Sequence, residues 1–479
     1  MRVRSSGFSG PSVLATVHLR LGLSLPQGVL NAGSMMTGSR FVLMGIDLRR
    51  RSVSLRAFSA TLCLATGLAA AGMTLREGRA AAGILDTRFG TGGRVITEFD
   101  GALDIARAVV AQSNGRIVVV GSSDSVRPFE ASNFAVARLL STGKLDTGFG
   151  VGGRVVTDFG DDSTAFAAAV QKDGKLVVAG EISHPGNHDF IVARYTKSGL
   201  PDTTFGAGGK IEIDLNSGSD DVALGVVVQP DGKIVAAGYA LTKFNFDVAA
   251  VRLTRTGSLD VAFGTGGKAV YNLAGTDICR SMALQKDGKL LLAGSTGADD
   301  FDFALLRLQT NGARDAGFGS QGLVRVDFGP DDDAAAIAVQ SDGRMVLAGR
   351  TTLAGVSDVA VARRMSNGAP DPTFAGDGST SLHSGDSSAA EGVALQSDGK
   401  IVVAGHAEVG GVPRFLVARI LSNGASDTAF GSGGVASTQF QNGDRAHAVA
   451  LQKDKKIVAA GETFFEGNND FAVARYSAR

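Results

Sequence analysis

Two sets of positions, each repeated seven times along the chain, contain the side chains best suited to acid–base chemistry or ligand binding. The first set stands five residues before a repeated glutamine, and the second directly follows a repeated glycine. We predict a ligand-binding rim made of Arg107, Tyr239, Arg280, Arg350, Glu391, His406 and His447. Imidazole and carboxyl groups that meet can transfer protons near neutral pH, and the candidates for this role are Arg280, Glu391, His406 and His447. The alternative is a set of ordinary solvated side chains, because spacing alone does not bring them together.

An aspartate stands eight residues before the repeated glutamine in five of the seven copies. These residues are Asp104, Asp221, Asp277, Asp332 and Asp444. A ring of carboxylates at the mouth of a channel could bind Ca²⁺, which is the only cofactor that the sequence suggests. Alternatively, each aspartate caps a turn by accepting hydrogen bonds from the backbone. His184 and His188 share one loop, but they lack enough further ligands nearby in the sequence for a zinc site.

The repeated glutamine and glycine belong to a hairpin motif that occurs seven times. Residues 171–180, QKDGKLVVAG, are one copy. Six copies contain Asp-Gly or Asn-Gly, which supplies the positive φ angles of a tight type I′ turn, and the seventh has Asp454-Lys455 instead. Short apolar runs rich in Val, Leu, Ile and Ala flank each turn. This pattern predicts a strand, a turn and a strand in every copy.

Each repeat also contains an Asp-x-x-Phe segment followed by glycines, and an apolar run that ends in arginine. The arginines are Arg138, Arg194, Arg252, Arg307, Arg363, Arg419 and Arg475. The aspartate of the next segment stands eight residues later, as in Arg194 and Asp202, and we predict a structural ion pair between them. The glycine-rich turn lacks the following helix of a phosphate-binding loop.

Four short strands in each repeat, with repeats 55 to 60 residues apart, are typical of a β-propeller blade. The sequence therefore predicts an all-β, seven-bladed propeller of four-stranded blades over residues 83–479. Small residues such as Ala106 and Ala165 precede each hairpin glutamine, which places the first hairpin strand innermost, where strands converge. We expect the strand at residues 93–99 to complete the last blade and to close the ring.

Three motifs together resemble the delta-60 repeat, a family of bacterial and often secreted proteins. They are the Asp-x-x-Phe-Gly-x-Gly-Gly opening, the Gln-x-Asp-Gly-Lys hairpin that ends in Ala-Gly, and the Asp-Phe-x-Val-Ala-Arg strand, and they recur over residues 85–477. The resemblance implies a β-propeller domain of unknown function and supports export. It implies no activity and no catalytic residue. Ala375 in place of glycine, and Arg414 in place of Asp or Asn, are local departures from these motifs.

The N-terminal region differs from the repeats in composition. Residues 1–43 are an unassigned extension, whereas residues 44–82 have the features of a signal peptide: three arginines at 49–51, an apolar run at 57–72 and small residues at 80–82. The alternative is an uncleaved anchor. Residues 1–82 carry ten Arg and two acidic residues, which leaves 37 basic and 45 acidic residues of the 47 of each kind for the rest of the chain. This acidic body, with few aromatic residues, argues against nucleic-acid binding.

These features predict an exported protein, periplasmic or extracellular, that serves as a binding scaffold for a protein or a glycan. We expect a monomer with no membrane span in the mature chain and no nucleic-acid partner. Two alternatives stay open. One is an enzyme, a hydrolase or a lyase, with its site at the channel mouth, and the other is a propeller stabilised by Ca²⁺.

Overall fold

The computed structural model describes residues 81–99, 101–125, 132–216, 218–243, 245–273 and 275–478. They belong to one compact unit, Met73–Arg479. The extension predicted at residues 1–43 lies outside the described residues, and so does the signal peptide predicted at 44–82, except for Ala81 and Ala82. Both assignments therefore stay predictions.

The described residues form 28 β-strands and no helix. The strands pair antiparallel in seven groups of four, which we call blades 1 to 7. Blades 7 and 1 are further joined by a single parallel pair, Leu103 with Asn469.

The strand bounds are as follows. Blade 1 contains β2 (Gly101–Ala111), β3 (Ile117–Ser125), β4 (Asn133–Leu139) and β5 (Arg154–Thr157), and blade 2 contains β6 (Asp162–Val170), β7 (Leu176–His184), β8 (Asn187–Tyr195) and β9 (Lys210–Ile213). Blade 3 contains β10 (Asp221–Val228), β11 (Ile234–Leu241), β12 (Phe246–Leu253) and β13 (Lys268–Tyr271), and blade 4 contains β14 (Thr276–Leu284), β15 (Leu290–Gly297), β16 (Phe301–Leu308) and β17 (Leu323–Val326). Blade 5 contains β18 (Asp333–Val339), β19 (Met345–Leu353), β20 (Val356–Arg364) and β21 (Ser379–Leu382), and blade 6 contains β22 (Ser387–Leu395), β23 (Ile401–Val409), β24 (Val412–Ile420) and β25 (Val435–Thr438). Blade 7 contains β26 (Asn442–Leu451), β27 (Ile457–Phe465), β28 (Asn468–Tyr476) and β1 (Arg94–Thr97).

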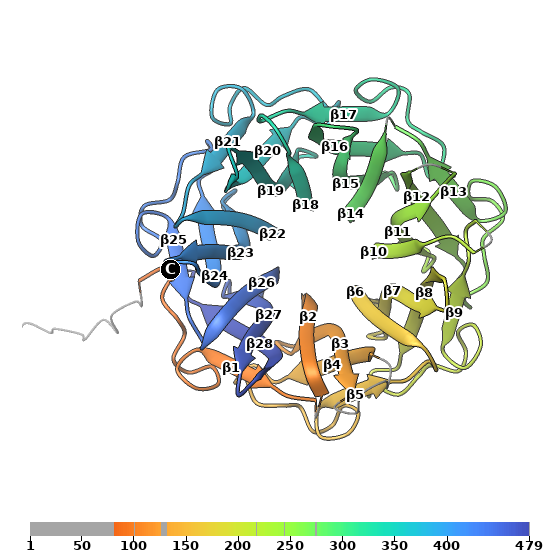
Figure 1. Cartoon of the computed structure of the whole chain (residues 1–479), viewed down its shortest axis with the longest axis horizontal. Coiled ribbons are helices and arrows are strands. Elements are labelled where there is room, and N and C mark those ends of the chain that lie inside the picture. The colour runs from red at the N-terminus through yellow and green to blue at the C-terminus, as the bar shows by residue number, and fades with distance from the viewer. Residues whose placement is uncertain are drawn as a thin grey trace, which may run out of the picture. The chain divides into compact units, whose positions relative to one another are not determined.

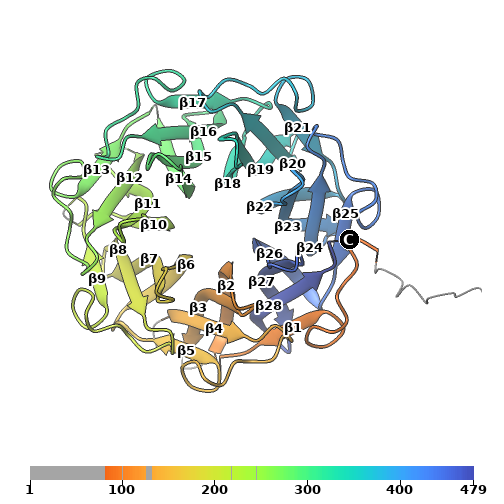
Figure 2. The same cartoon turned by 180° about the vertical axis from the view of Figure 1, so that it is seen from behind.

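Within this unit the blades follow one another around a central opening (Figure 1, Figure 2). The first hairpin strand of each blade lies nearest the opening, and a four-residue strand lies outermost. In blade 7 the outermost strand is β1, which pairs with β28 from Arg94 opposite Ala474 to Thr97 opposite Phe471. The architecture is the all-β propeller of four-stranded blades that the repeats predict.

The hydrophobic core lies between adjacent blades. The cluster between blades 2 and 3, for example, packs Val192 and Phe205 against Ala236 and Val251, and all four are fully buried. Near the opening the blades come too close for large side chains. A Cβ on Gly392 would lie 2.9 Å from the backbone nitrogen of Val449 in the next blade. The small residues of the inner strands are therefore a consequence of close packing.

A β-bulge interrupts the first strand of every blade at the same point. In blade 2, Ala165 pairs with Gly180 and Ala167 pairs with Ala179, so that Phe166 has no partner across the ladder. The bulge brings the Thr164 carbonyl against Gly180, where a Cβ would lie 1.9 Å from the oxygen. The repeated glycine of the hairpin motif therefore makes room for the bulge. The bulged residues are those that stand five positions before the glutamine: Arg107, Phe166, Leu224, Arg280, Ala335, Glu391 and His447.

Candidate binding site on the channel face

Every predicted structural arginine contacts the aspartate of an Asp-x-x-Phe segment. We call each set of Arg, Asp and Phe a corner. The nitrogen–oxygen distances are 2.7 to 2.9 Å, and the guanidinium carbon lies 4.1 to 4.9 Å from the centre of the Phe ring. The seven pairs are Arg138 with Asp146, Arg194 with Asp202, Arg252 with Asp260, Arg307 with Asp315, Arg363 with Asp371, Arg419 with Asp427, and Arg475 with Asp86.

The corners also join neighbouring blades, which the sequence pattern does not reveal. Arg307 Nη1 donates a hydrogen bond to the Ser366 carbonyl of blade 5 at 2.6 Å. Arg475 Nη1 makes the same contact from blade 7 to the Ser141 carbonyl of blade 1, at 2.5 Å. A buried guanidinium needs both a counter-charge and hydrogen-bond acceptors. The corner supplies both, so few guanidinium N–H groups of the arginine remain to bind a ligand.

The five aspartates considered for a Ca²⁺ ring have no exposed surface, so they do not line the opening as a solvated ring. One carboxylate oxygen of each accepts a hydrogen bond, at 2.5 to 2.8 Å, from a backbone N–H in the loop before the first strand. The donors are Phe99, Leu215, Leu273, Phe328 and Phe440, for Asp104, Asp221, Asp277, Asp332 and Asp444 respectively. These contacts have the geometry of turn caps.

Two of the five capping aspartates also lie beside other carboxylates. Each of the two belongs to a group of three carboxylates in which one oxygen of each residue lies within 4.8 Å of the others. The other three capping aspartates belong to no such group among the residues that the structure describes. Burial raises the pKa of Asp221 to about 6, and repulsion from Asp189 and Asp214 adds to the rise. The two groups are Asp189 with Asp214 and Asp221, and Asp302 with Asp327 and Asp332.

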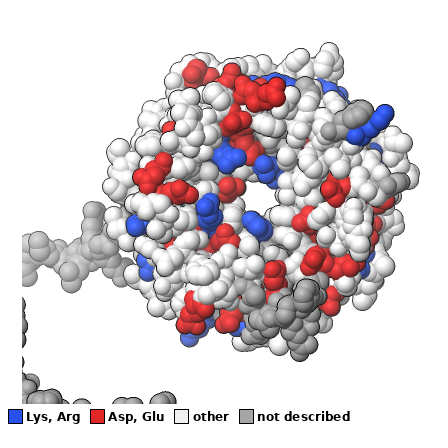
Figure 3. Space-filling view, viewed as in Figure 1, with Lys and Arg blue, Asp and Glu red and all other residues white. Residues whose placement is uncertain are grey.

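The predicted rim residues lie on the two strands of each blade that are closest to the opening. Arg107, Arg280, Glu391 and His447 are bulged residues of first strands, and Tyr239, Arg350 and His406 follow the glycine of second strands. Figure 3 shows Lys or Arg side chains gathered around the opening, with Asp and Glu side chains nearby. The bulge explains this arrangement, because a bulge redirects the side chain of its extra residue.

Contacts between blades connect the rim residues. Arg280 Nε donates to Asp333 Oδ1 of blade 5 at 2.8 Å. Burial raises the pKa of Glu391, while the positive charges of His447 and Arg280 oppose the rise. Burial likewise raises the pKa of Tyr239, and the nearby carboxylate of Glu181 in blade 2 adds to the rise.

The same network continues through blade 7 to blade 1. His447 Nε2 lies 3.5 Å from Glu462 Oε1. Burial acts to raise the pKa of Glu462, but the hydrogen bond from His447 and the charges of His447, Arg107 and Arg445 lower it overall. The structure therefore places the predicted rim residues near one another around the opening, where Arg280 pairs with Asp333 and His447 lies beside Glu462, while Arg350 is exposed.

His406 is held as a neutral imidazole within this network. Arg445 Nη1 donates a hydrogen bond to His406 Nε2 at 3.0 Å, so Nδ1 carries the ring proton. Burial, followed by the charge of Arg445, lowers the pKa of His406 to about 4. His406 Nδ1 is buried and has no hydrogen-bond acceptor among the described residues.

A pocket of ≈ 430 Å³ opens between blades 4 and 5 beside this network. Arg280 and Arg350 contribute guanidinium groups, and Asp331, Asp332 and Asp333 contribute carboxyl groups. Phe301 contributes an aromatic ring, and Ser295, Thr352 and Ser357 contribute hydroxyls. Such a lining suits a polar ligand rich in hydroxyl groups, and Arg350 can bind a carboxylate of that ligand.

Sequence reasoning missed the contacts that Asp333 and Arg445 make with rim residues, Arg280 and His406 respectively. Asp333 and Arg445 each directly follow a capping aspartate. The residues at this position differ between blades, as do those of the rim, and this variation was the available signal. They are Ile105, Thr164, Val222, Ile278, Asp333, Ala389 and Arg445.

Comparison with known proteins identifies the repeats. Seven segments match a family described as "Domain of unknown function (DUF5122) beta-propeller", namely residues 112–149, 171–205, 229–263, 285–318, 340–374, 396–430 and 452–478. No curated protein sequence matches the chain. Within the part of the chain that the structure describes, no helix has the length and hydropathy of a transmembrane span.

Several solved structures are similar at low sequence identity. Sqt1 from Chaetomium thermophilum is 14% identical, with 76% of this chain and 80% of that chain covered and a TM-score of 0.39. The first two extracellular domains of Drosophila Semaphorin 1b are 10% identical, with 81% and 86% covered and a TM-score of 0.39. Polysaccharide lyase Uly1 is 11% identical, with 82% and 92% covered and a TM-score of 0.42. Similarities at this level carry no conclusion about function.

Proposed function

Because the chain belongs to the family of β-propeller repeats of unknown function that its seven segments match, we propose that it is a binding scaffold whose ligand, a protein or a glycan, docks on the channel face. The observation that supports this most is the set of seven bulges. The backbone is the same in every blade, while the side chain it presents differs. A ligand without sevenfold symmetry needs such unequal partners.

The chemistry of the pocket between blades 4 and 5 makes an acidic glycan the first ligand class to test. Arg350, which is exposed, can bind a carboxylate by charge-assisted hydrogen bonds, whereas Arg280 already pairs with Asp333. Phe301 offers a face for a sugar ring, and the hydroxyls beside it can bond to sugar hydroxyls. Export, to the periplasm or outside the cell, is part of the proposal and rests on the sequence of residues 44–82.

A glycan array probed with the full-length chain, followed by calorimetry on the best oligosaccharide, tests the proposal. We expect an oligosaccharide that contains uronic acid to bind, and Arg350→Ala to weaken it at least tenfold without changing the melting temperature, since Arg350 is exposed. Arg325→Ala, which removes a partly exposed arginine from the outermost strand of blade 4, is the matched control. Equal binding by the wild type and Arg350→Ala would place the ligand elsewhere.

An enzyme, a hydrolase or a lyase, is the second candidate, and Glu391 is the observation that favours it. This carboxyl has a raised pKa through burial and lies near His447, which suits a general acid. Glu391→Gln should abolish any cleavage of a bound oligosaccharide while leaving its binding within about threefold. Binding with no cleavage by the wild type would leave the scaffold function alone.

We also propose that β1 closes the propeller in solution. Its pairing with β28 and the Arg475–Asp86 ion pair, at 2.9 Å, support this role, because each joins the N-terminal segment to the last strand. A closed ring leaves no unpaired blade edge to aggregate and is consistent with a monomer.

A further inference from the structure

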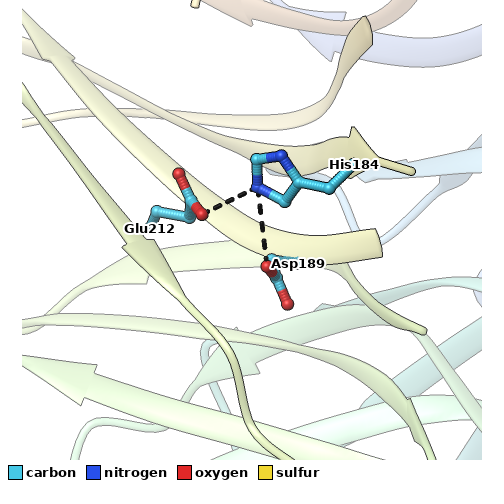
Figure 4. A group of neighbouring side chains, drawn as sticks. All are labelled: His184, Asp189 and Glu212. Carbon is cyan, nitrogen blue, oxygen red and sulfur yellow. Dashed lines mark hydrogen bonds and ion pairs between the residues drawn. The ribbon is translucent and has the colours of Figure 1, made fainter. Parts of the chain in front are cut away.

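Blade 2 carries a group of side chains that no other blade has. His184, at the end of β7, lies between Glu212 of β9 and Asp189 of β8 (Figure 4). His184 Nε2 is 2.8 Å from Glu212 Oε1 and 3.7 Å from Asp189 Oδ2. One ligand atom from each of the three residues lies within 4.8 Å of the others, a spacing that a single cation can bridge.

The orientation of the imidazole is set from its other side. His184 Nδ1 lies 2.8 Å from Asp161 Oδ2. A carboxylate at Nδ1 fixes that nitrogen as the hydrogen donor and leaves the lone pair on Nε2, as for many metal-binding histidines. A lone pair that faces two carboxylates is unfavourable unless a proton or a metal cation lies between them.

Asp189 supplies independent evidence for a missing partner. It is 4% exposed, and its Oδ1 atom has no hydrogen-bond donor among the described residues. Asp189 also lies within the second carboxylate group, with Asp214 and Asp221. Among the ion pairs of the described residues, none joins a Lys or Arg to these carboxylates. Asn187 donates a side-chain hydrogen bond to this carboxylate, but the Oδ1 atom is left without a partner, and a buried polar atom without a partner is costly.

The sevenfold repeat shows which parts of this group are specific to blade 2. The strand position of Asp189 is an aspartate in four other blades, so the repeat itself explains that residue. The position of His184, four residues after the repeated glycine, is occupied elsewhere by Ser125, Thr242, Ala298, Leu353, Val409 and Phe465. The position of Glu212 is occupied elsewhere by Ile96, Val156, Val270, Arg325, Ser381 and Ser437. Blade 2 alone adds both a histidine and a glutamate.

We propose that His184, Asp189 and Glu212 bind one divalent transition-metal ion of the Zn²⁺ class. An imidazole with two carboxylates suits Zn²⁺, whereas Ca²⁺ takes six to eight oxygen ligands. The side chains of His184 and Glu212 are 27% and 39% exposed, which leaves room for water or a ligand group as the fourth partner. This site is distinct from the predicted Ca²⁺ ring and does not depend on the proposed function of the channel face.

A charged imidazolium is the competing arrangement. The hydrogen bonds with Glu212 and Asp161 raise the pKa of His184, so a proton could satisfy the carboxylates in place of a metal. The two arrangements differ in what they predict for added Zn²⁺. A metal competes with the proton, and its binding releases it.

Calorimetric titration of the full-length, chelator-treated protein with ZnCl₂ at pH 7.5, and separately with CaCl₂, tests the proposal. We expect one Zn²⁺ site, lost or weakened at least tenfold in both His184→Ala and Glu212→Ile, where the new isoleucine matches Ile96 in β1. His383→Ala removes a histidine that pairs with one carboxylate, Asp358, at 2.6 Å, and it should leave the site unchanged.

Three outcomes would overturn the proposal. Zn²⁺ binding that His184→Ala leaves unchanged would place the metal elsewhere in the chain. Tighter binding of Ca²⁺ than of Zn²⁺ at this site would contradict the metal class. An absence of Zn²⁺ binding, together with an NMR spectrum in which both ring nitrogens of His184 carry protons at pH 7.5, would establish the imidazolium instead.

Discussion

The corners and the bulges of the propeller are both repeated seven times, but the corners repeat their side chains whereas the bulges repeat only their backbone. A corner repeats its side chains, so that Arg194 and Arg307 make the same ion pair, ring contact and link to the next blade. A bulge repeats only its backbone, so that the same position holds Arg280 in blade 4 and Glu391 in blade 6. The comparison suggests that constant corners permit a variable channel face.

The corner of blade 7 provides the strongest way to break this comparison, because both ends of the described chain form it. Phe89 comes from the N-terminal segment, and Phe205 occupies the same position between blades 2 and 3. Both are fully buried beneath an arginine. Phe89→Ala and Phe205→Ala should each lower the free energy of unfolding by about 4 kcal/mol, because each leaves a cavity. Equilibrium unfolding in urea measures both losses.

A matched control is Val151→Ala, since Val151 is 88% exposed and its loss should change little. If Phe205→Ala lowers the stability and Phe89→Ala does not, the N-terminal segment is not docked in solution. That result would contradict the proposed closure by β1 and would leave blade 7 with three strands.

Removal of a corner arginine should have the next largest effect. Arg194 is 5% exposed, and Asp202 keeps a second partner, Lys175 Nζ, at 2.8 Å when the arginine is lost. Arg194→Ala should therefore destabilise the fold by about 3 kcal/mol, the lower end of the range for a broken buried ion pair. Thermal unfolding monitored by circular dichroism measures the change.

The double variant Arg194→Met with Asp202→Leu sharpens this result. It removes both charges, so it should lose less stability than Arg194→Ala alone. An equal or larger loss would mean that the ion pair itself stabilises the corner beyond the cost of an unpaired charge. Arg88→Ala, which removes an arginine whose side chain is 86% exposed, is the control.

The sequence could predict those features that each repeat encodes locally. The Asp-Gly turns, the apolar runs and the eight-residue spacing of Arg194 and Asp202 each depend only on residues that are close together in the sequence. The bulge has a local signal as well, the glycine opposite it at Gly180, but the turn residues explain the hairpin without it. The hairpin pattern therefore gives no separate reason for that glycine.

The contacts between blades could not be predicted in the same way. His184 and Glu212 are 28 residues apart, and their meeting depends on the register of three strands. The sequence showed His184 in a loop with too few ligands, because the remaining ligands stand on other strands. An aspartate stands at the position of Asp189 in four other blades, so the sequence offers no reason to expect a special role for Asp189 beside a histidine. Sites of this kind appear only when strands that are distant in sequence are aligned.

The smallest expected effect concerns a buried aspartate at the start of β28. Asp470 is 2% exposed, and burial raises its pKa to about 6, with Asp104 and Glu98 adding repulsion. Its pKa in the unfolded chain is about 3.9, so the folded protein holds this proton more tightly. The resulting stability is full below pH 4 and is lost as the pH rises through 6. Asp470→Asn should therefore raise the free energy of unfolding by about 2 kcal/mol at pH 7.5 and leave it unchanged at pH 4.

Asp358 stands at the same position of blade 5 but faces His383, at 2.6 Å, instead of carboxylates. Asp358→Asn should accordingly give no gain at pH 7.5, since it removes a partner of a histidine. Urea unfolding of both variants at pH 7.5 and pH 4 measures these changes in the free energy of unfolding. A gain from Asp470→Asn that persists at pH 4 would show that its cause is packing and not charge. No gain at either pH would mean that burial and repulsion do not raise the pKa of Asp470.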